Sequence, residues 1–351
     1  MFKPDYRNLE DCARNKKPAR IPLYEHNVDP GVAERITGQP FVHCYFDEKP
    51  DYETFFRHFC GFFRDYGYDA VSYECCITLI LPDGGALNNL RPGVIQSAGD
   101  FEKYPFDRVP QIFIDTFKPK LDALKKVMPD GMKAVGGVGN GVFEIAEDLV
   151  GYENLCLLSY DDPDLYAALF ARIGRMMKEI WSWFLDEYAD LYCVCRFGDD
   201  LGYRSNTLVS PDDLRAHVLP AYKGIVDLVH AKDKPFLLHS CGCIFSVMDD
   251  LIDKVGIDAK HSNEDQIAPM SEWVERYGDR IGNFGGLDTD HLVRMPLPEL
   301  EQKVRDLWAL ACGKNGGFAI GSGNSIPAYV DDERYLLFLK TVRTLRGDFE
   351  D

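Results

Sequence analysis

The sequence has no long hydrophobic segment and no excess of positive charge. Its longest uncharged apolar run, residues 75–81, is far shorter than the roughly 20 residues that span a bilayer. Lys and Arg number 39 against 57 Asp and Glu, which gives a net charge of −18. This balance argues against nucleic-acid and anionic-membrane partners, which bind clustered cations. Residues 1–20 are polar and lack the apolar segment of a signal peptide, so we expect a soluble, cytoplasmic protein.

The sequence also lacks internal repeats, low-complexity tracts and Gly/Ser linkers that would divide it into domains. Hydrophobic residues make up 46% and charged residues 27% of the 351 positions, which is typical of a globular protein. Eleven cysteines occur without a secretion signal, so we expect reduced thiols rather than disulfides. Most such thiols fill hydrophobic cores, and some bind metals.

Short β-rich runs alternate with helical patterns along the chain. The predicted strands are residues 21–26, 70–74, 133–139, 191–200, 235–240, 257–262, 281–288 and 317–325. The predicted helices include residues 51–67, 163–189, 210–232 and 296–314. This alternation predicts a single (β/α)₈ TIM barrel over residues 21–351, with residues 1–20 as an N-terminal helical extension. A doubly wound open sheet is the alternative, although the glycines at 136–141 do not have the dinucleotide-binding spacing.

In a (β/α)₈ barrel the active site lies at the C-terminal ends of the strands. The polar residues at these predicted ends are Glu25, His26, Glu74, Asn140, Asp199, Asp200, His239, Cys241, His261, Glu264, Asp288, Ser322 and Asn324. A structural protein has no reason to gather so many ionisable groups at one end of its sheet. The alternative is that about half of them are helix N-caps, with Asp288 and Asn140 as the first candidates.

The motif His-Ser-Cys-Gly-Cys, which begins at His239, combines residue types that bind metals. His239 and Cys241 at a strand end can turn an imidazole and a thiolate toward one ion, with Gly242 allowing the bend. Zinc suits this pair because it accepts mixed nitrogen, sulfur and oxygen ligands. Glu264 follows the next strand and is expected to approach the same ion. Chemistry alone does not decide between Cys241 and Cys243, and an isolated His-x-Cys pair is more often structural.

These residues resemble the uroporphyrinogen decarboxylase superfamily, and in particular its branch of cobalamin-dependent methyltransferases. The resemblance rests on the segments HSCGCIFSVMDDLIDKVGIDAKH, RYGDRIGNFGGLD and GFAIGSGNSIP. It implies a single (β/α)₈ barrel. That branch binds zinc through H-x-C, a Glu near the end of the next strand and a Cys in a glycine-flanked turn after the last strand. His239, Cys241 and Glu264 match the first three positions, whereas Ser322 stands where the fourth has cysteine.

The decarboxylase branch of the same superfamily is matched less well. Its first strand carries an R-Q-A-G-R-Y signature that binds the carboxylates of the porphyrinogen. Here residues 23–29 read LYEHNVD, which is acidic and contains no arginine. Porphyrinogen carboxylates would be repelled there rather than clamped, so we expect no decarboxylation of uroporphyrinogen.

The resemblance thus implies a methyltransferase that moves a methyl group from a small substrate, such as a methoxylated aromatic, to a corrinoid. The chain has no D-x-H-x-x-G motif, so the corrinoid is expected on a partner protein. One zinc per chain is expected as a Lewis acid, with His239, Cys241 and Glu264 as its ligands. Two alternatives stay open. One is a decarboxylase or lyase acting on another carboxylate, and the other is a non-catalytic barrel that binds a corrinoid or tetrapyrrole.

The remaining polar residues receive expected roles in this methyl transfer. The expected acid/base or substrate contacts are Glu74, Asp199, Asp200 and His261. The expected substrate-binding residues are Glu25, His26, Asn140, Asp288 and Ser322. Ser322 is expected to contribute little to metal binding, because an alcohol stays protonated near neutral pH and is a weak ligand.

Overall fold

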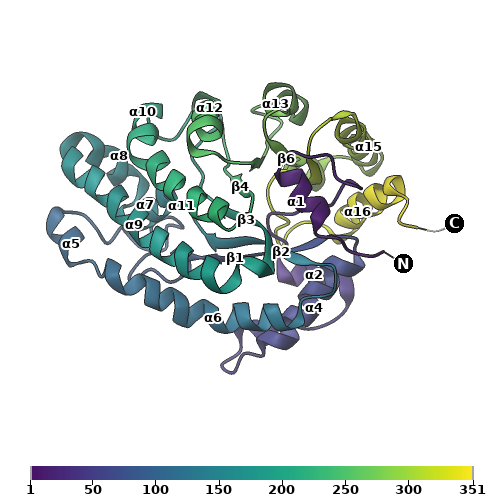
Figure 1. Cartoon of the computed structure of the whole chain (residues 1–351), viewed down its shortest axis with the longest axis horizontal. Helices are drawn as coiled ribbons and strands as arrows, with labels where there is room; N and C mark the ends of the chain where they lie inside the picture. Colours follow the sequence, from purple (N-terminus) through teal and green to yellow (C-terminus); the bar gives the residue numbers. More distant parts are fainter. Residues whose placement is uncertain (1, 350–351) are drawn as a thin grey trace.

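The computed structural model describes residues 2–349, in which seven parallel strands form one curled sheet (Figure 1). The strands are β1 (Ala70–Cys76), β2 (Lys133–Gly139), β3 (Tyr192–Gly198), β4 (Phe236–His239), β5 (Ala259–His261), β6 (Gly282–Leu287) and β7 (Phe318–Ser322). Hydrogen-bonded neighbours follow chain order from β1 to β7. Each strand lies within or overlaps a predicted run, so the predicted α/β class and its parallel sheet are confirmed.

The predicted eighth strand, residues 21–26, is absent from the described part of the chain. Leu23 forms only an isolated parallel bridge with Ile320 of β7. Pro22 has no N–H to donate, and its carbonyl accepts one hydrogen bond from Ile320 N at 2.9 Å. Tyr24 N also donates to Ile320 O at 2.8 Å. The next donor of β7, Ser322 N, binds the Glu25 side chain and not a backbone carbonyl, so the ladder ends there. The expected eight-stranded barrel is corrected to a seven-stranded curled sheet with an irregular segment beside β7.

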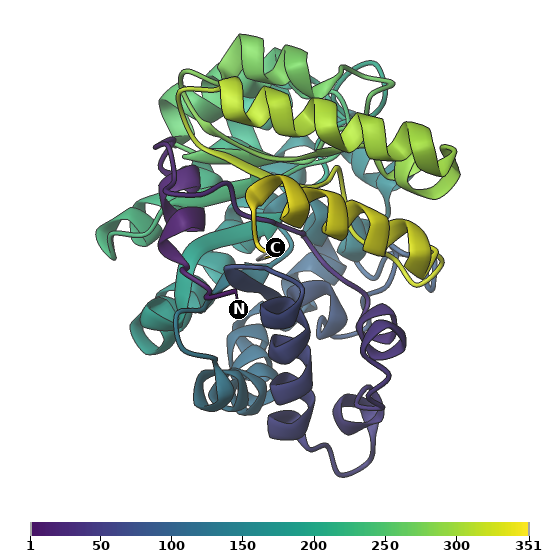
Figure 2. The same ribbon diagram turned by 90° about the vertical axis from the view of Figure 1, so that its right-hand side faces the viewer.

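Helices connect the strands and pack outside the sheet (Figures 1 and 2). They are α1 (Arg7–Ala13), α2 (Pro30–Thr37), α3 (His43–Phe46), α4 (Tyr52–Asp65), α5 (Ala98–Lys103), α6 (Val109–Val127), α7 (Val142–Val150), α8 (Tyr152–Asp161), α9 (Pro163–Tyr188), α10 (Pro211–Asp213), α11 (Leu219–Ala231), α12 (Met248–Asp250), α13 (Met270–Tyr277), α14 (Thr289–Arg294), α15 (Leu297–Gly313) and α16 (Asp332–Arg346). Within residues 2–349, no helix combines the length and apolarity needed to cross a membrane.

Three of the predicted helices are confirmed and the fourth is interrupted. The patterns at 51–67, 163–189 and 296–314 correspond to α4, α9 and α15. Residues 210–232 instead form α10, a π-helical turn (Leu214–Val218) and α11. Pro220 lies in the first turn of α11, where it has no N–H to donate and its ring crowds the preceding turn. The wider π-helical turn immediately before it accommodates this proline.

The N-terminal helix α1 closes one end of the curled sheet. Leu9 and Cys12 are buried in a cluster with side chains from inside the sheet, including Val194 of β3. The helix approaches the strands closely, since a Cβ atom at Gly317 would lie 2.0 Å from Cys12 O. Cys12 Sγ also lies 3.2 Å from Phe318 O, at the start of β7. This packing fills the end of the sheet where the strands begin and leaves the opposite end for a site.

Candidate functional site

Three histidines meet at the end of the sheet where the strands finish. His239 ends β4, His261 ends β5 directly opposite it, and His26 follows the segment beside β7. One ring nitrogen of each lies within 4.8 Å of those of the other two. His26 stacks on His239 with 3.7 Å between the ring centroids. Burial lowers the pKa of all three, that of His261 to about 3, so the rings are neutral imidazoles, the form that binds metals.

A second group of potential ligands shares His239. The ligand atoms of Asp200, His239 and Cys241 all lie within 4.8 Å of one another. His239 Nε2 is 3.5 Å from Cys241 Sγ and 3.9 Å from Asp200 Oδ1. Asp200 Oδ1 also accepts a hydrogen bond from Cys241 N at 2.8 Å, which holds the two residues together. Gly242 has φ +80°, and a Cβ atom there would meet the backbone of Gly202, so the predicted bend after Cys241 requires glycine.

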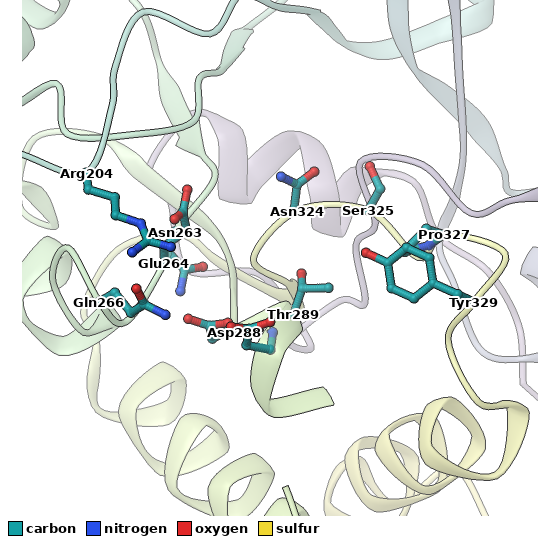
Figure 3. A pocket seen from close by; sticks show the side chains of 11 residues that line it. Arg204, Asn263, Glu264, Gln266, Asp288, Thr289, Asn324, Ser325, Pro327 and Tyr329 are labelled. Carbon is teal, nitrogen blue, oxygen red and sulfur yellow. Dashed lines mark hydrogen bonds between the residues drawn. The ribbon is translucent and has the colours of Figure 1, made fainter. Parts of the chain in front are cut away.

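Glu264, the expected third ligand, belongs to neither of the two groups found among the described residues. Its backbone forms a turn, with Glu264 O accepting a hydrogen bond from Ala268 N at 3.1 Å. Its side chain lines a polar cavity of about 360 Å³ (Figure 3), together with Arg204, Gln266, Asp288 and Thr289. Cys243 also lies outside both groups. The structure therefore groups Asp200, rather than the expected Glu264, with His239 and Cys241. The ligand role of Glu264 stays a prediction.

A second cavity, of about 350 Å³, lies on the His26 side of the site. Its aromatic wall consists of Tyr45, Phe46, Phe55, Phe59 and Tyr73, and its polar residues include His26, Ser72, Glu74 and Arg196. Ser325 lines both cavities. Asn324 lines the polar cavity and donates a hydrogen bond to Cys241 Sγ at 3.2 Å. The candidate ligands Asp200, His239 and Cys241 line neither cavity themselves. However, His239 contacts His26 of the aromatic cavity, and Cys241 contacts Asn324 of the polar one.

Arg196 of β3 is a site residue that sequence reasoning missed. It is 1% exposed, and its Nη2 and Nε lie 2.9 and 3.0 Å from Glu74 Oε2. Its Nη1 donates to Tyr24 Oη at 2.8 Å and to Ser72 Oγ at 3.0 Å. Glu74 also lines the aromatic cavity, and its Oε1 lies 3.7 Å from His26 Nε2 and 3.8 Å from Cys76 Sγ. One feature of the sequence could have revealed Arg196, namely its position inside the apolar run of β3. A buried arginine needs a carboxylate partner, so it points to a nearby acid.

Two of the expected site residues hold helices and loops instead. Asp199 is fully buried and accepts hydrogen bonds from Phe143 N at 2.9 Å, Glu144 N at 2.7 Å and the Tyr222 hydroxyl. It therefore anchors the first turn of α7 and is not among the residues that line either cavity, and its expected acid/base role stays a prediction. Asn140 accepts from Thr78 N at 3.1 Å and ties the end of β1 to that of β2.

The predicted N-cap role of Asp288 is confirmed. Its side chain accepts from Asp290 N at 2.7 Å and so caps α14, although it also borders the polar cavity. Glu25 and Ser322, both expected at the substrate, are fully buried against each other. Ser322 N donates to Glu25 Oε2 at 3.2 Å, and the Ser322 hydroxyl donates to the same oxygen at 2.5 Å. This pair packs beside Tyr68 and lines neither cavity, and its expected contact with substrate stays a prediction.

Comparisons with known proteins agree with this fold. The family model of uroporphyrinogen decarboxylase (URO-D) matches residues 7–345. A methyltransferase from Methanosarcina mazei superposes with a TM-score of 0.69 at 14% identity, covering 96% of this chain and 98% of that one. A D-allulose 3-epimerase from Methylomonas sp. gives a TM-score of 0.45 at 12% identity, covering 95% and 99% of the two chains. At 14% identity the similarity to the methyltransferase shows the fold alone. No curated protein matches the sequence.

Proposed function

This chain belongs to the uroporphyrinogen decarboxylase family, and on that premise we propose that it is a methyltransferase. We propose that it moves a methyl group from a small methoxylated aromatic to a corrinoid carried by a partner protein. The observation that carries the proposal is the Asp200–His239–Cys241 group beside an aromatic cavity of about 350 Å³. A cavity of this size is typical of sites for small molecules, and its wall suits an aromatic ring.

The donor set fits a zinc ion. Asp200, His239 and Cys241 offer one oxygen, one nitrogen and one sulfur, a mixture that zinc accepts. Three protein ligands leave a fourth position, as in catalytic rather than structural zinc sites. The Asp200 side chain is 43% exposed, which places this group at the open end of the sheet. When bound, zinc would supply a Lewis acid that stabilises the negative charge developing on the ether oxygen.

The residues around the aromatic cavity would bind and orient the methyl donor. Tyr45, Phe55 and Tyr73 offer ring faces and edges against which an aromatic substrate packs. Arg196 holds one oxygen of Glu74, and the other oxygen, Oε1, can accept a hydrogen bond from a hydroxyl on the substrate ring. Methyl transfer then breaks the bond between the methyl carbon and the ether oxygen. The electron pair of that bond would stay on the oxygen, and the methyl group would pass to the reduced corrinoid of the partner protein, whose cobalt would supply the electron pair of the new bond.

Two observations favour this function over decarboxylation of a porphyrinogen. Residues 23–29, where the decarboxylase signature carries arginine, contain no arginine. Arg196, which does reach the aromatic cavity, has its donors engaged by Glu74, Tyr24 and Ser72. Without a free arginine the cavity offers no clamp for a ring of carboxylates.

The proposal is tested by combining the purified chain, a methoxyphenol and a reduced corrinoid protein, and by following methylcobalt absorbance. We expect the absorbance to appear only when all three are present, and to be lost in Cys241→Ser but retained in Cys243→Ser. Cys243 is the matched control because it lies two residues away and outside both ligand groups found in the described residues. Demethylation without any corrinoid, or formation of coproporphyrinogen from uroporphyrinogen, would contradict the proposal.

A further inference from the structure

The carbonyl of Ser322 determines where the proton of His261 lies. His261 Nε2 is 2.9 Å from Ser322 O. A backbone carbonyl can only accept a hydrogen bond, so the imidazole must donate from Nε2. A neutral imidazole has a single N–H, and Nδ1 of His261 is therefore an acceptor.

This arrangement fixes the proton of His239 in turn. The Nδ1 atoms of His239 and His261 are 2.7 Å apart, a hydrogen-bond distance. Because His261 Nδ1 is the acceptor, His239 must donate from its own Nδ1. The lone pair of His239 then lies on Nε2, the nitrogen that faces Cys241 Sγ and Asp200 Oδ1. The opposite tautomer would bring two lone pairs together at 2.7 Å.

The position of Ser322, and so of its carbonyl, is fixed by hydrogen bonds to Glu25. Glu25 accepts hydrogen bonds from both Ser322 N and the Ser322 hydroxyl, and both residues are fully buried. The stacking of His26 on His239 holds the second ring in its plane. A chain of contacts thus runs from the buried carboxyl group of Glu25, through one backbone carbonyl and one imidazole, to the His239 ring.

We propose that His261 is a positioning residue, supported by Glu25 and Ser322, that selects the His239 tautomer whose Nε2 is free to bind a metal. This inference rests on the proposed function, because it concerns the same metal centre. It gives His261 a positioning role in place of the acid/base role expected from the sequence. It also excludes His261 Nδ1 as a ligand, although this ring lies close to His26 and His239. Partners that orient a metal-binding histidine in this way are worth about 10- to 100-fold in metal affinity.

The first test compares the zinc dissociation constants of the wild-type protein, His261→Leu and His261→Asn by competition with a chelator. Leucine is of similar size and has no acceptor, so we expect affinity to fall about 10- to 100-fold. Asparagine can place its carbonyl oxygen near the former Nδ1, and we expect it to recover most of the affinity. Equal, complete loss of zinc in both variants would show that His261 is a ligand. Unchanged affinity in His261→Leu would show that the contact is merely structural, and either result would overturn the inference.

The second test needs no metal. Long-range ¹H–¹⁵N NMR spectra of the metal-free protein with ¹⁵N-labelled histidine report the tautomer of each ring, with His239→Gln providing the assignment. We expect His239 to carry its proton on Nδ1 in the wild-type protein and to gain the Nε2–H form in His261→Leu. An Nε2–H tautomer in the wild-type protein would overturn the inference. The expected tautomer in a protein that binds no zinc would contradict the proposed function instead, which separates the two failures.

Discussion

At the scale of single residues, the direction of a side chain decides its role. His26 enters the site, whereas its neighbour Glu25 points behind the segment toward Tyr68 and the Ser322 hydroxyl. The sequence places both at the end of one predicted strand. It could not tell which of two adjacent polar residues faces the site, because that depends on how the segment lies against β7. Burial raises the pKa of Glu25 to about 8.

Replacing Glu25 with glutamine is expected to change how stability depends on pH. The pKa of Glu25 is raised from 4.5 in a free side chain to about 8, so its stabilising contribution is complete below pH 4.5 and is lost as pH rises through 8. The glutamine in Glu25→Gln cannot ionise. The free energy of unfolding of this variant should therefore rise relative to that of the wild-type protein as the pH is raised from 5 to 8. One proton allows a slope of at most about 1.4 kcal/mol per pH unit. Urea unfolding at pH 5, 6.5 and 8 measures the difference.

The control for this experiment is Glu333→Gln, which changes an exposed carboxylate at the start of α16. The difference between its free energy of unfolding and that of the wild-type protein should not change between pH 5 and 8. A difference between Glu25→Gln and the wild-type protein that does not change with pH would mean that Glu25 is ionised in the folded chain.

At the scale of elements, the sequence predicted what depends on local periodicity and missed what depends on neighbours. The seven strands and the helices α4, α9 and α15 follow from patterns of apolar residues within one segment. The irregular segment at 21–26 and the π-helical turn before Pro220 could not be predicted in this way, because prolines interrupt patterns that otherwise read as regular. Local periodicity also does not distinguish the two adjacent acids at the end of β3. Asp199 accepts hydrogen bonds from the first turn of α7, whereas Asp200 lies beside His239.

Substitutions of Asp199 and of Asp200 are expected to differ in their effect on the free energy of unfolding. Asp199→Ala leaves the buried donors Phe143 N, Glu144 N and the Tyr222 hydroxyl without an acceptor, so we expect a loss of about 2–4 kcal/mol in the free energy of unfolding. Asp200→Ala removes a half-exposed side chain with one backbone donor, and we expect a loss of about 1 kcal/mol or less. Urea unfolding of both variants checks this order. Equal losses would contradict the assignment of Asp199 to α7.

At the scale of the whole molecule, one end of the sheet is filled by packing and the other carries the candidate site. The N-terminal helix α1 fills the end where the strands begin, and the histidines and Cys241 gather where the strands finish. Sequence reasoning placed polar residues at the correct end of the sheet, because that end follows from the order of strands and helices. It named Glu264 as a ligand and Asp200 as an acid/base residue, and it did not place Asp200 beside His239 and Cys241, since the loops after β3 and β5 are set by contacts made in the folded chain.

Stability and metal binding are therefore expected to separate along the sheet. Leu9→Ala opens a cavity at the filled end, and we expect the free energy of unfolding to fall by about 2–4 kcal/mol. The zinc content of the folded fraction should stay unchanged, because α1 lies at the opposite end from His239. Urea unfolding together with elemental analysis of the folded protein checks both statements. A loss of zinc from the folded fraction would show that the two ends are coupled.

The central claim is that Asp200, His239 and Cys241 hold one metal ion. Elemental analysis of the zinc-loaded wild-type protein, Asp200→Asn and Glu264→Gln tests it most directly, since the two variants remove one charge each from neighbouring acids. The account predicts about one zinc per chain in the wild-type protein and in Glu264→Gln, and well below one in Asp200→Asn. Full zinc in Asp200→Asn together with its loss in Glu264→Gln would contradict the account.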